Sequence, residues 1–164
     1  MALGRRNVHA VAISPYIKWL RDLVGHELLV LPSAAVVPRD ADGRVLLVRL
    51  SDSGQWAVVG GAVEPDESPE DAAVREAQEE AGVTVRLGAI LAVLGGPEYR
   101  VTYPNGDQTS YVSTVYDASV IAGSPTPDGD ETLEARWWDV DALPYGEMSN
   151  FTRALLGALG LGRA

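Results

Sequence analysis

An acid-rich segment in the first half of the chain constrains its structure more than any other feature. It spans residues 60–83 and reads GGAVEPDESPEDAAVREAQEEAGV. Ser68 suits a helix N-cap and Gly82 suits a helix end, so the pattern predicts a helix over residues 68–81. At about 100° per residue, three glutamates share one arc of roughly 100° beside an apolar stripe of small residues. The glutamates are Glu76, Glu79 and Glu80, and the stripe contains Ala73, Val74, Ala77 and Ala81.

The charge balance of this helix indicates a metal site. Residues 66–80 contain seven acids and a single base, Arg75. Glu76 and Glu80 are like charges four residues apart, which destabilises a helix by roughly 0.2–0.5 kcal/mol. A solvated face is the ordinary explanation for glutamates on a helix, but such a face usually intersperses lysines. Three converging carboxylates without a cationic partner instead suit a hard divalent ion, Mg²⁺ or Mn²⁺.

The rest of the chain alternates between helix and strand patterns. Two further helices are predicted at residues 15–25 and 150–159, capped by Ser14 and Ser149. Strand patterns occupy residues 33–37, 44–50, 56–59, 83–94, 99–120 and 133–138. The Asn105-Gly106 pair predicts a hairpin turn within the longest of these stretches. Strands flanked by amphipathic helices predict a layered α/β fold with helices on both faces of a mixed sheet.

Length and composition favour one soluble domain and exclude several kinds of site. The chain has 164 residues, near the commonest size for a single domain. It has no cysteine, which excludes a disulfide scaffold, a cysteine-ligated zinc site and a thiol nucleophile. The net charge of −10 is a poor match for a nucleic-acid backbone. The short apolar stretch after Arg5 and Arg6 runs into Pro15 and does not match a signal peptide, so we expect a cytoplasmic protein.

The acid-rich segment also resembles the Nudix box, G-x5-E-x7-R-E-U-x-E-E-x-G-U, in which U is a bulky aliphatic residue. Gly61, Glu67 and the run 75–83 match every fixed position, although Ala77 is small for its aliphatic position. The flanking strands extend the resemblance to residues 30–160. It implies a Nudix-type α/β/α sandwich with a mixed sheet between helices. Residues 31–164 would form the hydrolase domain, and residues 1–30 an N-terminal extension with a short helix.

The resemblance implies a set of oxygen ligands for the metal. Glu76, Glu79 and Glu80 would hold Mg²⁺, with Mn²⁺ as the alternative, together with the main-chain carbonyl of Gly60. The metal would neutralise the anionic pyrophosphate and lower the pKa of a bound water. Members of this family often add a glutamate from a loop outside the box. The candidates for this extra ligand or base are Glu131 and Glu134, and the choice of general base among the glutamates stays open.

The remaining fixed positions of the box imply structural roles. Glu67 and Arg75 would pair and hold the loop against the helix, while Gly61 and Gly82 occupy the glycine positions. The family usually has a proline just before the paired glycines, where this chain has Val59. The change restores a backbone N–H and frees one φ angle, so it bears on how rigidly the Gly60 carbonyl is presented.

The activity implied is hydrolysis of a pyrophosphate bond in a nucleoside diphosphate linked to another moiety. Nucleoside triphosphates, nucleotide sugars, ADP-ribose and dinucleoside polyphosphates all fit this description. The partner would be a small-molecule nucleotide derivative, with no nucleic acid or membrane, and a homodimer stays open. Arg49 is a candidate phosphate contact, and Trp56 and Tyr99 are candidates for stacking on a base. The alternative function is a non-catalytic Nudix-fold module that senses a nucleotide or sugar phosphate.

Overall fold

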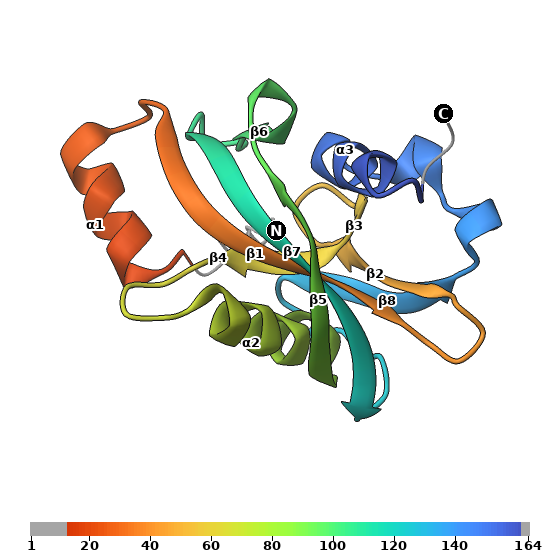
Figure 1. Cartoon of the computed structure of the whole chain (residues 1–164). Coiled ribbons are helices and arrows are strands. Elements are labelled where there is room, and N and C mark those ends of the chain that lie inside the picture. Colours follow the sequence, from red (N-terminus) through yellow and green to blue (C-terminus); the bar gives the residue numbers. More distant parts are fainter. Residues whose placement is uncertain (1–12, 162–164) are drawn as a thin grey trace, which may run out of the picture.

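The computed structural model describes residues 13–161, so residues 1–12, with the Arg5-Arg6 stretch, and residues 162–164 lie outside it. Its centre is a mixed eight-stranded sheet (Figure 1). The strands are β1 (Leu29–Arg39), β2 (Val45–Leu50), β3 (Trp56–Ala57), β4 (Val59–Ala62), β5 (Thr84–Leu94), β6 (Arg100–Thr102), β7 (Gln108–Ala122) and β8 (Thr132–Trp138). The main path runs β3-β2-β1-β7-β5, while β4, β6 and β8 pair with β1, β7 and β2. β1 and β7 are parallel, and every other pair is antiparallel.

Three α-helices confirm the helix predictions to within one or two residues. They are α1 (Pro15–Val24), α2 (Pro69–Ala81) and α3 (Asn150–Ala158). Each begins after a serine whose hydroxyl accepts a backbone N–H three residues later. Gly82 ends α2 in the left-handed conformation, with φ of 65°, as its sequence position predicts. Within residues 13–161, no helix combines the length and apolar character that crossing a membrane requires.

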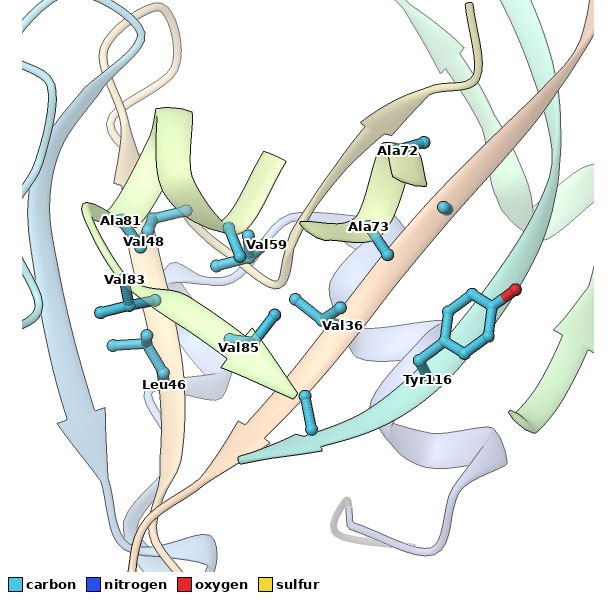
Figure 2. Close-up of a cluster of buried hydrophobic side chains, with 13 residues drawn as sticks. Val36, Leu46, Val48, Val59, Ala72, Ala73, Ala81, Val83, Val85 and Tyr116 are labelled. Carbon is cyan, nitrogen blue, oxygen red and sulfur yellow. The ribbon is translucent and has the colours of Figure 1, made fainter. Parts of the chain in front are cut away.

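The helix α2 lies close to one face of the sheet because its buried side chains are small. Its alanines pack against Val36, Leu46 and Val48 from the central strands. Figure 2 shows these methyl groups meeting the valines of the sheet. The buried alanines are Ala72, Ala73, Ala77 and Ala81. Val74, which was expected in this stripe, is exposed instead, and the buried arc extends toward Glu76 and Glu80, which are also buried.

The opposite face is covered by α3, which confirms the predicted sandwich (Figure 1). Leu155 and Leu156 are fully buried there against Val45, Leu47 and Met148. The helix is also tied to the sheet by a hydrogen bond, in which the backbone N–H of Val58 donates to the hydroxyl of Thr152 at 3.1 Å. The centre of the sheet is therefore buried on both sides, with one core beneath α2 and another beneath α3.

The segment around the paired glycines differs from the prediction. The strand expected over residues 56–59, ending at Gly60, is instead interrupted at Val58. It resumes as β4, which runs through both glycines. Gly60 and Gly61 lie opposite Ala35 and Ala34 of β1. A Cβ atom at Gly60 would overlap the carbonyl oxygen of Ala34, so the strands approach this closely only because residue 60 has no side chain. The glycines thus act as strand residues and not as a strand end.

Leu156→Ala tests the packing of α3 on the sheet. The substitution removes a fully buried side chain, so we expect a loss of about 2–5 kcal/mol in the free energy of unfolding. Leu133→Ala, at an exposed position of β8, should change it by less than about 0.5 kcal/mol. Urea unfolding of both variants measures the difference. Equal, small effects would mean that α3 does not belong to the cooperative core.

Candidate active site

Two carboxylates of α2 lie against the glycine strand β4. The backbone N–H of Gly60 donates to Oε2 of Glu80 at 3.0 Å. Glu76 lies over Gly61, where a Cβ atom would overlap its carboxylate. Both glutamate residues are buried, although they carry like charges one helical turn apart. Gly61 is therefore required by the space that the Glu76 carboxylate occupies, in addition to its place in the strand.

Arg75 joins this pair to the rest of the acid-rich segment. Its Nε and Nη2 donate to the two oxygens of Glu67 at 2.8 and 2.9 Å, which is the pair that the resemblance implied. Nη2 also donates to the carbonyl of Ala62 at 3.1 Å. Nη1 donates to Glu76 at 2.6 Å and to Glu79 at 3.0 Å. One guanidinium therefore fixes the loop, the strand and two of the predicted metal ligands.

The expectation that the three glutamates have no cationic partner is wrong, because Arg75 pairs with two of them. The same Arg75 nitrogen binds Glu76 and Glu79, but the two side chains differ in exposure. The Glu79 side chain is 60% exposed, compared with 11% for Glu76. Within residues 13–161, no three acidic, histidine or cysteine side chains are gathered closely enough to hold a metal ion. The structure thus brings Glu76 and Glu80 together and leaves Glu79 at the surface beside them.

Burial sets the protonation of the inward-facing pair. It raises the pKa of Glu80 well above the usual range, and the negative charge of Glu76 adds to this effect. Burial likewise raises the pKa of Glu76, although the hydrogen bond and positive charge of Arg75 oppose it. By contrast, the hydrogen bonds from Arg75 lower the pKa of Glu67. Burial and mutual repulsion therefore favour the protonated form of this pair when no cation balances its charge.

Asp128, in the same turn as the candidate Glu131 before β8, is a further acid that the sequence did not single out. Asp128 accepts hydrogen bonds from the backbone N–H groups of Asp130, Glu131 and Thr132. The Thr132 hydroxyl donates to the backbone carbonyl of Glu80 at 2.7 Å, which ties the turn to the end of α2. The charges of Asp128 and Glu131 contribute to the raised pKa of Glu80, so both lie within electrostatic reach of it. The only sequence signal was the Asp-x-x-x-Thr spacing, which fits a side-chain-capped turn.

The two candidate outer glutamates differ in position: Glu131 lies in the turn before β8, and Glu134 lies within the strand. Along β8, Ala135 packs on the α2 side and Trp138 on the α3 side. Side chains alternate along a strand, so Glu134 belongs to the α3 side, opposite the glutamate pair. There it pairs with Arg49 at 2.8 Å, while Arg49 also donates to the Gly54 carbonyl. Arg49 and Glu134 are thus partners of each other, and of the two candidates only Glu131 contributes to the raised pKa of Glu80.

The aromatic candidates for base stacking lie in the core beneath α3. Trp56 and Tyr99 are both buried. Trp56 meets the ring of Trp138 edge-on at 5.1 Å, and Tyr99 meets Phe151 edge-on at 5.4 Å. Their sequence positions on or beside strands did not distinguish a core partner from a ligand platform. As placed here, both rings serve packing, so the stacking interpretation is not supported.

The donor chemistry at β4 suits a divalent cation. Carboxylate and carbonyl oxygens are hard ligands, which Mg²⁺ and Mn²⁺ prefer to softer donors. The buried Glu76 and Glu80 repel one another, and a cation between helix and strand would remove this repulsion. Gly61 leaves the side of β4 next to the Glu76 carboxylate free of a side chain. Val59, at the position usually held by proline, is fully buried opposite Val36 and leaves the strand pairing intact.

Comparison with known proteins agrees with this geometry. A family model described as the NUDIX domain matches residues 30–157. An ADP-ribose pyrophosphatase of Methanocaldococcus jannaschii is 33% identical over 128 residues, which cover 76% of this chain and 72% of that protein. Nucleoside triphosphatase NudI of Salmonella agona is also 33% identical over 128 residues, covering 73% of this chain and 90% of its own length.

Solved structures show the same fold. A MutT NUDIX hydrolase from Burkholderia pseudomallei superposes with a TM-score of 0.65 at 27% identity, covering 81% of this chain and 98% of that one. A UDP-X diphosphatase superposes with a TM-score of 0.67 at 19% identity, which bears on the fold alone. The family model, the relatives and the fold agree with the box at residues 61–83. The chain therefore belongs to the Nudix family and is a Nudix pyrophosphohydrolase.

Proposed function

We propose that this chain is a Mg²⁺-dependent hydrolase, with Mn²⁺ as a substitute, of a nucleoside diphosphate linked to another moiety. Nudix hydrolases generally use a divalent metal, and relatives are named for ADP-ribose and nucleoside triphosphates. The observation that carries the proposal is the buried pair Glu76 and Glu80 against Gly60 and Gly61. Burying two like charges side by side is costly unless a cation joins them.

Glu76, Glu79, Glu80 and the Gly60 carbonyl are the proposed ligands. When bound, the metal would neutralise the pyrophosphate oxygens and lower the pKa of the attacking water. One nitrogen of Arg75, Nη1, donates hydrogen bonds to both Glu76 and Glu79 and so orients their carboxylates. Because the same guanidinium also binds Glu67, both glutamates are tied to the loop. A carboxylate must accept the water's proton, and Glu79, Glu80 and Glu131 are the candidates within this cluster.

The charge distribution supports a small substrate that arrives with its metal. Residues 62–81 contain eight acids and one base, so this part of the chain repels a free polyphosphate. A nucleic-acid backbone presents one negative charge for every phosphate and would be repelled over a longer surface. A magnesium-bound nucleotide derivative carries less charge and is the substrate class that we propose.

A screen of nucleotide derivatives tests the function. We expect phosphate-containing products only with Mg²⁺ or Mn²⁺, and none after chelation, because the acids alone repel the substrate. Glu80→Gln should lower kcat by at least about 100-fold, because the amide lacks the charge of a ligand or base. Glu70→Gln, at an exposed position of the same helix, should keep wild-type kcat and serves as the control. Released phosphate after coupling to a phosphatase measures all of these rates.

Two outcomes of this screen would contradict the proposal. Turnover that survives exhaustive chelation would remove the metal from the mechanism. Tight binding of a nucleotide without any turnover in Mg²⁺ or Mn²⁺ would instead identify a sensing module.

Glu131→Gln and Glu134→Gln separate the two outer glutamates. Glu131 lies within electrostatic reach of Glu80, so its loss should lower kcat by about tenfold or more. Glu134 pairs with Arg49 on the opposite face, so Glu134→Gln should leave kcat within about twofold of wild type. Steady-state rates on the same substrate measure both. The reverse order of effects would place the outer ligand on the α3 side.

Glu80→Gln should also stabilise the protein in chelator at neutral pH. A carboxylate with a raised folded pKa binds more protons folded than unfolded, so its contribution to stability falls as pH rises. The penalty starts near the unfolded pKa of about 4.3 and grows until the raised folded pKa is passed. We therefore expect the variant to melt about 2 °C or more above wild type at pH 7, and the gap to close below about pH 4. Melting curves across pH, with Glu70→Gln as control, check this, and a variant that melts lower at pH 7 would contradict it.

A further inference from the structure

Hydroxyl side chains gather on the α3 face of the sheet, where β7 begins. The odd-numbered residues of β7 point to this face, because Val115 packs in the core beneath α3. Thr109, Tyr111 and Ser113 therefore form one row. Ser33 lies opposite Ser113 on the parallel strand β1 and points to the same side. The face that is apolar at Val115 is thus lined with hydroxyls at this end.

Two of these hydroxyls are buried without a partner. Ser33 and Ser113 are 6% and 0% exposed, and neither hydroxyl has a hydrogen-bond partner among residues 13–161. Burying a hydroxyl in this state costs stability, and alanine would occupy the position without that cost. The pair therefore indicates that a polar group from outside the chain is accommodated on this face.

Tyr103 and Tyr111 join the row to the hairpin between β6 and β7. Their hydroxyl oxygens lie 2.7 Å apart. Burial raises the pKa of Tyr111, and hydrogen bonds with Tyr103 and Thr109 oppose this effect. Two phenols bring two hydrogens, and the bond between them uses one. One phenolic hydrogen is therefore left to donate to an acceptor beyond the described residues.

Arg21 of α1 fixes this network from its other end. Its Nη2 donates to the Gln108 carbonyl at 2.7 Å and to the Thr109 hydroxyl at 3.0 Å. Its Nη1 donates to two carbonyls in the turn after α1. A guanidinium can only donate, so Thr109 accepts from it and directs its own hydrogen to Tyr111. The Arg21 side chain is 9% exposed and its donors are engaged, so it does not serve as a phosphate contact.

The turn of the hairpin is attached to α1 as well. Asp107 is buried, 3.6 Å from Nε of Arg21 and 2.7 Å from Nδ1 of His26. The Asn105 side chain also donates to it. At the other side of the hairpin, β6 lies near α3 (Figure 1), where Tyr111 meets Phe151 edge-on at 6.2 Å. Because α1 precedes the segment that the family model matches, the hairpin is held from outside that segment.

The hydroxyls lie within reach of a substrate held at the glutamates. The N–H of Gly60 donates to Glu80, and the N–H and C=O of a strand residue point to the same edge. The Gly60 carbonyl thus faces the outer edge of β4, whose one partner among the described strands is β1. Since α2 packs on one face here, the rest of a bound substrate extends toward the α3 face. Ser33 pairs with β4 on that side, and the charge of Glu76 adds to the raised pKa of Tyr111.

We propose that the Tyr103–Tyr111 pair is a specificity-determining contact for the nucleoside end of the substrate, and that Arg21 positions it. This inference rests on the proposed function, because it takes the pyrophosphate to be held at Glu76 and Glu80. The available phenolic hydrogen is donated to a base or ribose acceptor. A site built to hydrogen-bond such a group rejects analogues that lack it. A neutral nucleoside fits the cluster better than a phosphate, because the donors of Arg21 are already engaged.

Steady-state kinetics test the contact on the nucleotide that the screen finds to be hydrolysed fastest. Tyr103→Phe and Tyr111→Phe keep the ring and remove the hydroxyl, so KM should rise about tenfold in each, while kcat stays within about twofold. Tyr16→Phe removes an exposed hydroxyl on α1 and should keep the wild-type KM. Inorganic pyrophosphate has no nucleoside, so its Ki as a competitor should stay within about twofold in every variant.

Product inhibition by AMP, UMP and 2′-deoxyAMP assigns the acceptor. The ratio of the AMP and UMP Ki values reports a contact to the base, and the ratio of the AMP and 2′-deoxyAMP values reports a contact to the ribose. We expect one of these ratios to move toward one in Tyr103→Phe and Tyr111→Phe. If both ratios stayed at their wild-type values, the pair would not determine specificity.

A double-mutant cycle tests the positioning role of Arg21. Arg21→Gln should raise KM about tenfold, and adding Tyr111→Phe should raise it by less than about a further twofold, because Arg21 acts through that hydroxyl. Thr109→Val interrupts the same network and decides the question if Arg21→Gln does not fold. Lys18→Gln, at an exposed position of the same helix, should leave KM unchanged. Circular dichroism and melting curves establish that each variant is folded.

Three results would overturn the inference and leave the proposed hydrolase activity intact. KM could stay at its wild-type value in both phenylalanine variants. The pyrophosphate Ki could rise in step with KM, which would place the effect at the metal site. The effects of Arg21→Gln and Tyr111→Phe could multiply, which would make Arg21 an attachment for α1 alone. A chain that hydrolyses no nucleotide would instead refute the proposed function, and this inference with it.

Discussion

The arrangement of the active site depends on the guanidinium of Arg75. Its five hydrogen bonds join the loop at Glu67, the strand at Ala62 and the helix at Glu76 and Glu79. A planar fork with several donors can do this, whereas the single ammonium of a lysine cannot hold three carboxylates in fixed directions. Without it, the acids of this segment would repel one another and the loop would lose its attachment to α2.

The alanine face of α2 and the glycines of β4 have complementary consequences. Alanines let the helix approach the sheet, Gly61 leaves room for the Glu76 carboxylate, and Gly60 lets β4 approach β1. Close packing therefore places Glu76 and Glu80 in a buried layer, where their pKa values are raised. Burying these two carboxylates costs stability at neutral pH, because a raised folded pKa disfavours the charged form.

Much of the fold and part of the site could be predicted from local sequence. The serine caps and the alanine spacing predicted the helices, and the Asn-Gly pair predicted a hairpin turn, because each of these signals acts over only a few residues. The box marked the Glu67–Arg75 pair. Helical angles did not show that Arg75 also reaches Glu76 and Glu79, since that depends on side-chain rotamers. Nor could the sequence separate Glu131 from Glu134, because the face of each residue depends on the pairing of β8 with β2, which is irregular near Leu50.

The overlap between position 61 and the Glu76 carboxylate links two residues that are far apart in the chain. Any side chain at position 61 must displace the carboxylate from the place where Arg75 holds it. A chain that had lost the carboxylate would be free to accept alanine or serine at position 61. The residue at that position is therefore a simple diagnostic for Nudix sequences of unknown activity: where glycine is retained, the space for the acid is retained as well.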